Sequence, residues 1–418
     1  MSDRVSARAG TFTDNMRLPV HRWYRYSAGF SAEWVEAVLG TGPGRKESGP
    51  RRVLDPFSGS GTTVFTAARL GFEAVGCEAH PFVHRIAQAK AAALRCPPEV
   101  LQAGHTHLTE AAARRPRALL TEEPELTRRC FPEETLAALV ALRDTFGEMQ
   151  FESPDVREAF FLAITAVLRS CSSAGTAQWQ YVLPRKSKSR QAAPATALAE
   201  KVRQLITDRA AFGHLETAPT LLHTDVRTGL PLGPFDVVTT SPPYANNYDY
   251  ADATRLEMTF WREIGGWGDL AAVRPGLVRS CSQHAAAERA EIERRGADPA
   301  LAPIADVLVA TCAALSAERA HHGGHKRYDL MILAYFQDLA QILSHLRGVM
   351  APGSTMHWVV GDSAPYGVHV PVDAWLGALA THHGFGPARF EKWRDRNLKW
   401  KNRKHRVPLQ EGVLTLPG

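Results

Sequence analysis

The stretch Arg51-Arg-Val-Leu-Asp-Pro-Phe-Ser-Gly-Ser-Gly-Thr-Thr63 joins a short apolar run to a segment with helical spacing. Residues 51–55 predict a buried strand, and residues 62–70 predict a helix that ends at Gly71. A second strand is expected over residues 72–76, followed by a helix over 81–94. Strand, glycine turn, helix and strand in this order form a βαβ unit, so the sequence predicts a parallel sheet covered by helices.

The same alternation returns later in the chain. Strands are expected at 221–225, 235–238 and 355–360, and helices at 328–349 and 373–382. A further helix is expected to begin after Ser31, which is suited to be its N-cap. Residues 96–218 and 262–327 have helical spacing without strand signals. We therefore predict a discontinuous α/β domain over residues 1–95 and 219–418, with helical insertions over 96–218 and 262–327.

Composition narrows the class of protein. The chain has 418 residues, of which 44% are hydrophobic and 22% charged, as in ordinary soluble proteins. A net charge of +6 permits a polyanionic partner. An uninterrupted apolar run of ~18 residues and a secretory signal core are not found, so we expect neither a membrane nor a secreted protein. The six cysteines contain no C-x-x-C pair, which fits a reducing cytoplasm and indicates no cysteine zinc site.

The glycine turn has the features of an adenosine-cofactor site. Gly59 and Gly61 let the backbone approach a ligand, and Glu78 at the tip of the next strand can accept the hydroxyls of a ribose. A nucleotide P-loop would need Lys after the second glycine, where Thr62 stands, and a dinucleotide site would need a third glycine at Val64. The Asp-Pro-Phe lead at residues 55–57 distinguishes a third candidate, S-adenosylmethionine, from both.

Thr240-Ser-Pro-Pro-Tyr244 follows the predicted strand 235–238. Two consecutive prolines remove two N–H donors, so neighbouring carbonyls and the Ser241 hydroxyl form a group of acceptors beside an aromatic ring. Such a group suits an exocyclic amine of a base stacked on Tyr244. The alternative is a proline-rich turn closed by a core tyrosine.

Together the two motifs resemble the amino-methyltransferases of nucleobases, which include DNA cytosine-N4 and adenine-N6 methyltransferases. The resemblance covers roughly residues 21–90 and 220–410. It implies a class I methyltransferase fold, that is, a Rossmann-like doubly wound sheet, here with helical insertions. It also implies S-adenosylmethionine as the cofactor and DNA as the partner. The wide gap between Glu78 and Asp225 differs from the family's compact arrangement, and residues 96–218 are a candidate target-recognition region.

The resemblance assigns roles to individual residues. The cofactor would contact Phe30 and Ser31 at its methionine end, Glu78 at its ribose and Asp225 at its adenine amino group. The glycine turn would contribute Asp55, Pro56, Phe57, Gly59, Ser60, Gly61, Thr62 and Thr63, and the catalytic loop would be Ser241, Pro242, Pro243 and Tyr244. Serine at the first loop position favours cytosine N4, whereas adenine-N6 enzymes mostly have Asp or Asn there.

Basic residues near the C-terminus alternate with tryptophans and suit a phosphate backbone with stacked bases. Candidate nucleic-acid contacts are Arg394, Arg396, Lys399, Lys401 and Arg403, with a second loop of Arg185, Lys186 and Lys188. The alternative is a solvated basic face with its tryptophans packed on the core. His321-His-Gly-Gly-His325 lacks a matching Cys or Glu, so we predict no metal. No cysteine nucleophile is required.

The sequence therefore predicts a cytoplasmic DNA methyltransferase that acts on an exocyclic amine, most simply cytosine N4, of a base extruded from the duplex. Methylation of adenine N6 or of an RNA base is the alternative within the same fold. A nucleic-acid-binding module without catalysis is the alternative from another class. The recognised sequence, the biological system and the oligomeric state stay open.

Overall fold

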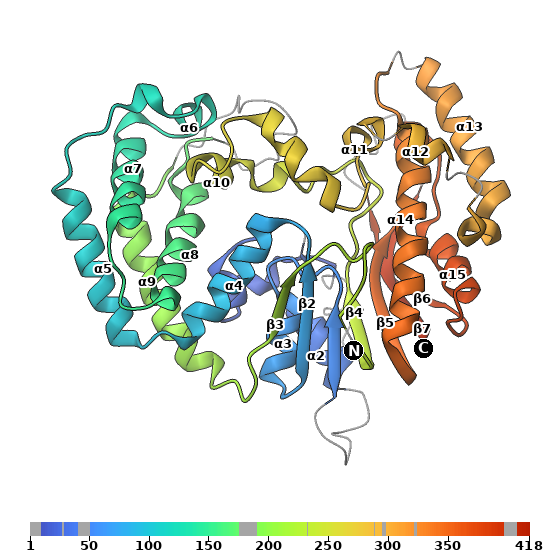
Figure 1. Ribbon diagram of the computed structural model, residues 1–418, viewed down its shortest axis with the longest axis horizontal. Helices are drawn as coiled ribbons and strands as arrows, with labels where there is room; N and C mark the ends of the chain where they lie inside the picture. The colour runs from blue at the N-terminus through green and yellow to red at the C-terminus, as the bar shows by residue number, and fades with distance from the viewer. Residues whose placement is uncertain are drawn as a thin grey trace.

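The computed structural model describes residues 10–26, 29–40, 51–174, 190–231, 233–287, 289–294, 298–321, 324–396 and 408–418. Its centre is a seven-stranded sheet in the order β3-β2-β1-β4-β5-β7-β6 (Figure 1). The strands are β1 (Arg52–Asp55), β2 (Glu73–Glu78), β3 (Thr220–His223), β4 (Phe235–Thr240), β5 (Met350–Gly361), β6 (Arg389–Arg396) and β7 (Leu409–Pro417).

Strand direction places the two sequence motifs side by side. β1 pairs in parallel with β2 on one side and with β4 on the other. Because neighbouring parallel strands end at the same edge of a sheet, the glycine turn after β1 and the Ser-Pro-Pro-Tyr loop after β4 leave the sheet together. β7 runs antiparallel to both β5 and β6. The mixed sheet with helices on both faces confirms the class I methyltransferase fold.

The strands contribute side chains to two hydrophobic cores, one on each face of the sheet. Val53 and Ala74 belong to one core, whereas their chain neighbours Leu54 and Val75 belong to the other. Successive side chains of a strand point to opposite faces, so a sheet with two buried faces needs apolar residues at both positions. This explains why consecutive apolar residues occur in β1 and β2.

The helices of the α/β part agree with the sequence prediction to within a few residues. They are α2 (Ala32–Gly40), α3 (Thr62–Arg69), α4 (Pro81–Arg95), α14 (Tyr328–Val349) and α15 (Val372–His382). Ser31 Oγ accepts a hydrogen bond from Trp34 N at 3.4 Å, as expected of an N-cap. Gly71, with φ +80°, follows α3 in the left-handed conformation that glycine adopts readily.

Helices also make up the described parts of residues 96–218 and 262–327, the two segments that the sequence analysis interprets as insertions. The first contains α5 (Pro98–Ala113), α6 (Glu125–Cys130), α7 (Glu133–Glu148), α8 (Pro154–Cys171) and α9 (Pro194–Phe212). The second contains α11 (Ser282–Ala287), α12 (Arg289–Arg294) and α13 (Ala305–His321), preceded by α10 (Arg255–Phe260). Short 3₁₀ turns are η1 (Asp14–Arg17), η2 (His21–Trp23), η3 (Leu120–Glu122), η4 (Asp252–Thr254), η5 (Trp267–Ala272), η6 (Arg274–Gly276), η8 (Pro299–Ile304) and η9 (Pro365–Gly367). In Figure 1, α5 to α9 gather at one side of the molecule and α13 to α15 at the other.

The C-terminal segment differs from its prediction. Residues 389–396, interpreted from sequence as part of a basic run, form β6 and pair with β7. β6 was not predicted because it lacks the usual apolar alternation, and Trp393 is its buried residue. The Trp393 ring lies 5.2 Å from that of Trp34 in an edge-on contact, so this tryptophan packs on the core.

One helical run is more apolar than the sequence analysis expected. Residues Pro299–His321 are long and apolar enough to cross a membrane, and 22% of the window is buried. Length and composition alone are weak grounds for a span. Leu308 and Leu315 of α13 are buried in the core cluster that also contains α14 residues, whereas Val307 and Val309 are exposed. In this structure α13 is a surface helix of the α/β domain.

Candidate active site

A cavity opens at the carboxyl ends of the parallel strands, which is where open α/β sheets bind their ligands. The lining residues are Tyr26, Pro56, Phe57, Gly59, Cys77, Glu78, Ala79, His80, Thr224, Asp225, Val226, Ser241, Pro243, Tyr250, Gly276, Leu277 and Val278. The structure therefore brings the glycine turn, the acids after β2 and β3, and the Ser-Pro-Pro-Tyr loop to one cavity.

The glycine turn presents bare backbone to this cavity. Gly59 has φ +52° and Gly61 has φ +93°, so both adopt conformations that favour glycine. A Cβ at Gly59 would lie 3.0 Å from the Tyr26 ring, and one at Gly61 would lie 2.5 Å from the Phe65 ring. The turn is also supported from behind, because the buried Lys90 donates from Nζ to the Ser60 carbonyl at 3.0 Å.

Glu78 lies half-buried at the tip of β2 and accepts hydrogen bonds from two backbone segments. Oε2 accepts from Gly59 N at 2.9 Å, and Oε1 accepts from His80 N at 2.7 Å. Burial raises the pKa of Glu78 to about 7 despite these bonds. The carboxylate thus links the glycine turn to the start of α4 and faces the cavity.

Asp55 connects the two motifs directly. Its Oδ1 accepts from Thr240 Oγ1 at 2.5 Å and from Phe57 N at 3.0 Å. Burial raises the pKa of Asp55 to about 6. A second bond, from Thr63 Oγ1 to the Thr239 carbonyl at 3.0 Å, joins the same two segments. Asp55 is therefore a buried tie between the end of β1 and the end of β4.

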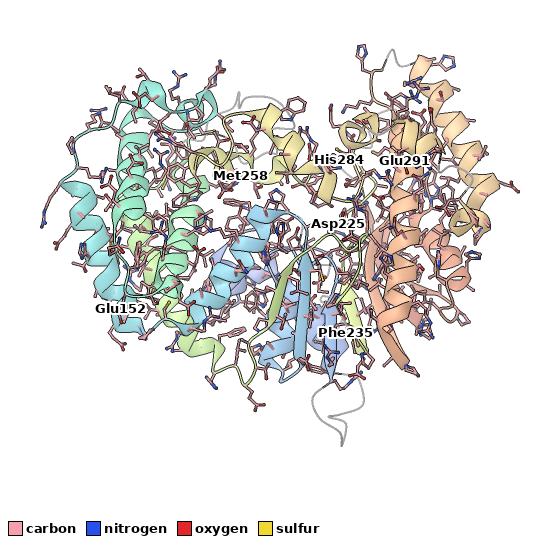
Figure 2. The ribbon with its side chains drawn as sticks, in the orientation of Figure 1. Glu152, Asp225, Phe235, Met258, His284 and Glu291 are labelled. Carbon is pink, nitrogen blue, oxygen red and sulfur yellow. The ribbon has the colours of Figure 1, made fainter. Side chains whose placement is uncertain are left out.

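Asp225, labelled in Figure 2, follows β3 and lines the cavity wall. It forms an ion pair with Arg227 at 2.7 Å, and Arg227 also reaches Asp338 of α14 at 3.3 Å. Asp338 is almost completely buried and also pairs with Arg279. The carboxylate of Asp225 is thus oriented by a charged network that is anchored in α14.

The Ser-Pro-Pro-Tyr loop is held on two sides. Ser241 Oγ donates to the Val359 carbonyl of β5 at 3.2 Å, and Tyr244 N donates to Tyr250 Oη at 3.2 Å. Asn247 has φ +62°, and its Oδ1 accepts from Ser282 N of α11 at 2.9 Å. The loop is consequently a fixed element between β5 and α11.

A guanidinium group lies over the ring of Tyr244. The Arg396 guanidinium lies 5.0 Å from the ring centroid and donates from Nη1 to the Asp362 carbonyl at 2.8 Å. Arg396 and Arg394 both pair with Glu411, at 3.4 and 2.7 Å, and the Glu411 side chain is only 2% exposed. The sequence analysis assigned both arginines to nucleic acid, whereas the structure gives each an internal partner.

Other predicted residues lie apart from the cavity lining. Phe30 packs edge-on against Trp34 at 5.7 Å, and Ser31 caps α2. Pro242 and the side chains of Ser60, Thr62 and Thr63 are buried near the strand ends. Six predicted nucleic-acid contacts lie outside the described residues: Arg185, Lys186, Lys188, Lys399, Lys401 and Arg403.

Several lining residues had no assigned role at the sequence level. Tyr26, Leu277 and Val278 come from segments far from either motif, so no spacing could relate them to the cavity. His80 offered a signal, because it stands two residues after Glu78 and before a proline at a helix start. Its ring is buried, and Nε2 lies 3.1 Å from Thr254 Oγ1.

Known proteins are similar to this chain in amino-acid sequence. The DNA methylase family model of N6/N4 methyltransferases matches residues 51–89, which contain the glycine turn and Glu78. The chain is 23% identical to the type II methyltransferase M.AvaI of Nostoc sp., over 92% of this chain and 83% of the relative. It is 25% identical to the type II methyltransferase M.BsoBI of Geobacillus stearothermophilus, over 60% of this chain and 54% of that protein.

The cavity fits the cofactor that this family uses, S-adenosylmethionine. A side chain at Gly59 would fill the space beside Tyr26, and the carboxylates of Glu78 and Asp225 line the cavity as hydrogen-bond acceptors. The turn, the acids and the adjacent Ser-Pro-Pro-Tyr loop occur in one cavity, and the family model matches the stretch that builds its cofactor side. The family match, the two relatives and this geometry together support an amino-methyltransferase of the N4/N6 family.

Proposed function

We propose that this chain is a site-specific DNA methyltransferase that modifies the N4 amine of cytosine. The observation that carries the proposal is that Ser241 and Pro243 open into the same cavity as Gly59 and Glu78. An amine bound at the loop would thus meet a cofactor bound at the turn. If the loop lay far from the residues of the glycine turn, a methyl group could not pass directly from the cofactor to the amine.

The loop is built to accept N–H protons. When bound, the cofactor supplies an electrophilic methyl group on a sulfonium. Ser241 uses its one hydroxyl proton on the Val359 carbonyl, so its lone pairs remain available as acceptors. Together with the Pro242 carbonyl, Ser241 would accept the amine protons and draw the nitrogen lone pair out of the aromatic ring. Catalysis would then rest on positioning and on electrostatic stabilisation.

Cytosine is favoured by Ser241, because the family mostly has Asp or Asn at this position in adenine-N6 enzymes. The experiment is incubation of the protein with S-adenosylmethionine carrying a labelled methyl group and with DNA or RNA, followed by mass spectrometry of nucleosides. Labelled N4-methylcytosine from DNA supports the proposal. N6-methyladenine, or methylation of RNA alone, replaces it with the corresponding activity. Binding of nucleic acid without label would establish a non-catalytic binding module.

The DNA arrangement is also part of the proposal. A base inside a duplex cannot reach the cavity, so we infer that the target is flipped out and stacks on Tyr244. Arg185, Lys186, Lys188, Lys399, Lys401 and Arg403 would contact phosphates, and residues 96–218 would read the target sequence as an insertion into the domain formed by 1–95 and 219–418. Residues 262–327 would be a second insertion.

The two relatives are named type II methyltransferases, so we propose a role in restriction-modification, within the cytoplasm. Methylation-aware sequencing of DNA from cells that express the protein would report base, position and motif together. Modification at a single short motif supports site specificity. Scattered modification would contradict it.

A further inference from the structure

Three potential metal ligands meet beside the catalytic loop. Asp249 follows this loop in the chain, Cys281 immediately precedes α11, and His284 lies in its first turn; all three are buried. One ligand atom from each lies within 4.8 Å of the others. This group was not recognisable from local spacing, because 32 positions separate Asp249 from Cys281. Figure 2 labels His284 at this position in the molecule.

His284 gives the strongest structural evidence for a metal site in this cluster. Its side chain is 2% exposed, and neither ring nitrogen lies within hydrogen-bond distance of a partner among the described residues, although the side chains of Asp249 and Cys281 are close enough to interact with the ring. Nε2 lies 3.6 Å from Asp249 Oδ1, which is too long for a hydrogen bond. It is close to the separation of about 3.4 Å that two ligands have when each lies about 2.0–2.1 Å from a tetrahedral zinc ion.

We propose that Asp249, Cys281 and His284 form a zinc site. A thiolate, an imidazole and a carboxylate are the ligands that Zn²⁺ takes in proteins, and Zn²⁺ suits this mixed set better than Mg²⁺ or Ca²⁺ does. Three protein ligands leave the fourth tetrahedral position for water. Arg274 Nε donates to Asp249 Oδ2 at 3.2 Å and Ala251 N donates to Oδ1 at 3.0 Å, contacts of the kind that orient a ligating carboxylate.

The site would fasten the catalytic loop to α11. These segments already touch, because Ser282 N donates to Asn247 Oδ1 at 2.9 Å and Asn247 N donates to the Ser280 carbonyl at 3.2 Å. Tyr250, the residue after Asp249, lines the cofactor cavity and accepts from Tyr244 N. A bound ion would thus be structural and would hold the loop in place without contacting the reacting atoms.

An ion pair is the competing explanation. Although burial disfavours a charged ring, the neighbouring Asp249 carboxylate raises the pKa of His284 to about 9. A protonated His284 would occupy the position that the metal requires. The two explanations differ in whether the folded protein binds metal, and this can be measured without methylation activity.

The test uses the full chain without a histidine tag. Elemental analysis after purification without chelator should give about one zinc per chain. Titration of the zinc-stripped protein with Co²⁺ should give a thiolate-to-Co²⁺ band in the near ultraviolet. Both signals should be lost in Cys281→Ser and in His284→Gln but kept in Cys312→Ser, which changes a cysteine outside the cluster.

Wild-type protein that is folded by circular dichroism but holds neither zinc nor Co²⁺ would overturn the proposal in favour of the ion pair. The proposal would equally fail if Cys281→Ser kept the thiolate band, because the ligand would then be another cysteine. Since the wild-type measurement is decisive alone, a variant that does not fold leaves the conclusion intact. Failure here would not affect the proposed methylation, which is read from labelled nucleosides.

Discussion

At the scale of single residues, the proposed cofactor site contains Glu78, a half-buried acid that is only partly ionised near neutral pH. Burial raises the pKa of Glu78 to about 7, whereas the backbone N–H groups of His80 and Gly59 stabilise its charged form. A carboxylate accepts both ribose hydroxyls, but a carboxylic acid must use one oxygen as a donor. Cofactor binding therefore favours the ionised form.

The first prediction concerns how the affinity for the cofactor depends on pH. Affinity for S-adenosylmethionine should rise as pH increases through about 7 and should fall by up to about tenfold per pH unit below it, as expected for one proton. Isothermal titration calorimetry between about pH 6 and pH 8 measures this. Asp55, with its pKa raised by burial to about 6, adds to the decline at the acid end.

Glu78→Gln is the control for this profile. It should bind the cofactor more weakly at every pH and should lose the dependence centred near 7. A variant with an unchanged pH profile would show that another group titrates, for which Asp55 and His80 are the nearest candidates.

Tyr244 gives the opposite pattern in a second prediction. Its ring lies outside the lining of the cofactor cavity, so Tyr244→Ala should bind S-adenosylmethionine nearly as the wild type does. Stacking of a base on an aromatic ring is worth about 1–3 kcal/mol, so kcat/KM for DNA should fall about 5- to 150-fold. Tyr244→Phe keeps the stacking surface and should retain most of the activity. If Tyr244→Ala lost as much affinity for the cofactor as for DNA, the ring would belong to the cofactor site and not to the base site.

At the scale of elements, the junction of β1 and β4 decides whether the two motifs work as one site. Asp55 Oδ1 and Thr240 Oγ1 join the ends of these strands at 2.5 Å, in a fully buried position. Adjacent Thr239 offers a matched comparison, because its Oγ1 is buried without a hydrogen-bond partner among the described residues.

The third prediction compares these threonines. Thr240→Val should lower the free energy of unfolding by about 1–3 kcal/mol, since it leaves the Asp55 acceptor short of a donor. Thr239→Val should be neutral or stabilising, because it removes an unpaired hydroxyl at constant shape. Urea denaturation measures both. Equal destabilisation by the two variants would mean that packing, and not this hydrogen bond, holds the junction.

The β6–β7 ribbon supplies the fourth prediction. Arg394 and Arg396 both pair with Glu411, but the contact with the Tyr244 ring is made by Arg396. Arg396→Gln should therefore lower kcat/KM for DNA by about 2- to 30-fold, the value of a cation–π contact of about 0.5–2 kcal/mol. Both variants should lower the stability of the protein, because each removes a partner of the buried Glu411. Arg394→Gln should nevertheless keep the wild-type kcat/KM for DNA. Similar turnover in both variants would remove any role for Arg396 in positioning Tyr244.

At the scale of the whole molecule, buried ion pairs attach the helical segment to the α/β domain. Glu123, before α6, accepts from Arg143 of α7 at 2.7 Å and from Arg262, after α10, at 2.7 Å. Arg143 also donates to the Phe260 carbonyl at 2.9 Å. Glu123 is 1% exposed, so loss of one partner leaves buried charge uncompensated.

The fifth prediction concerns this junction. Glu123→Gln should lower the free energy of unfolding by about 3–5 kcal/mol, whereas Glu148→Gln, which breaks the solvent-exposed pair with Arg115, should cause a much smaller loss. Although burial opposes ionisation, the two arginines lower the pKa of Glu123 below its usual 4.5. The stability it contributes is therefore complete above pH 4.5 and is lost as pH falls through the lower folded pKa. A Glu123→Gln variant as stable as Glu148→Gln would show that the junction does not rely on charge.

Much of the fold and of the cofactor side of the site could be read from the amino-acid order. Residues 51–78 place strand, glycine turn, helix and acid within one continuous unit, and local spacing specifies such a unit because each element contacts its neighbour in the chain. The expected helices at 62–70, 81–94 and 328–349 agree closely with α3, α4 and α14. Ser241 to Tyr244 were recognisable because two prolines after an apolar strand are a strong local signal.

Long-range contacts could not be read in this way. The pairing of Glu411 with Arg394 and Arg396, the contact of Arg396 with Tyr244, and the meeting of Asp249 with Cys281 and His284 all join segments that are distant in the chain. No periodicity links such positions, because their distance is set by strand order and by the packing of inserted segments. Residue types and local spacing thus specified the chemistry that the chain offers, while the folded arrangement specified which of those groups face a ligand and which neutralise one another.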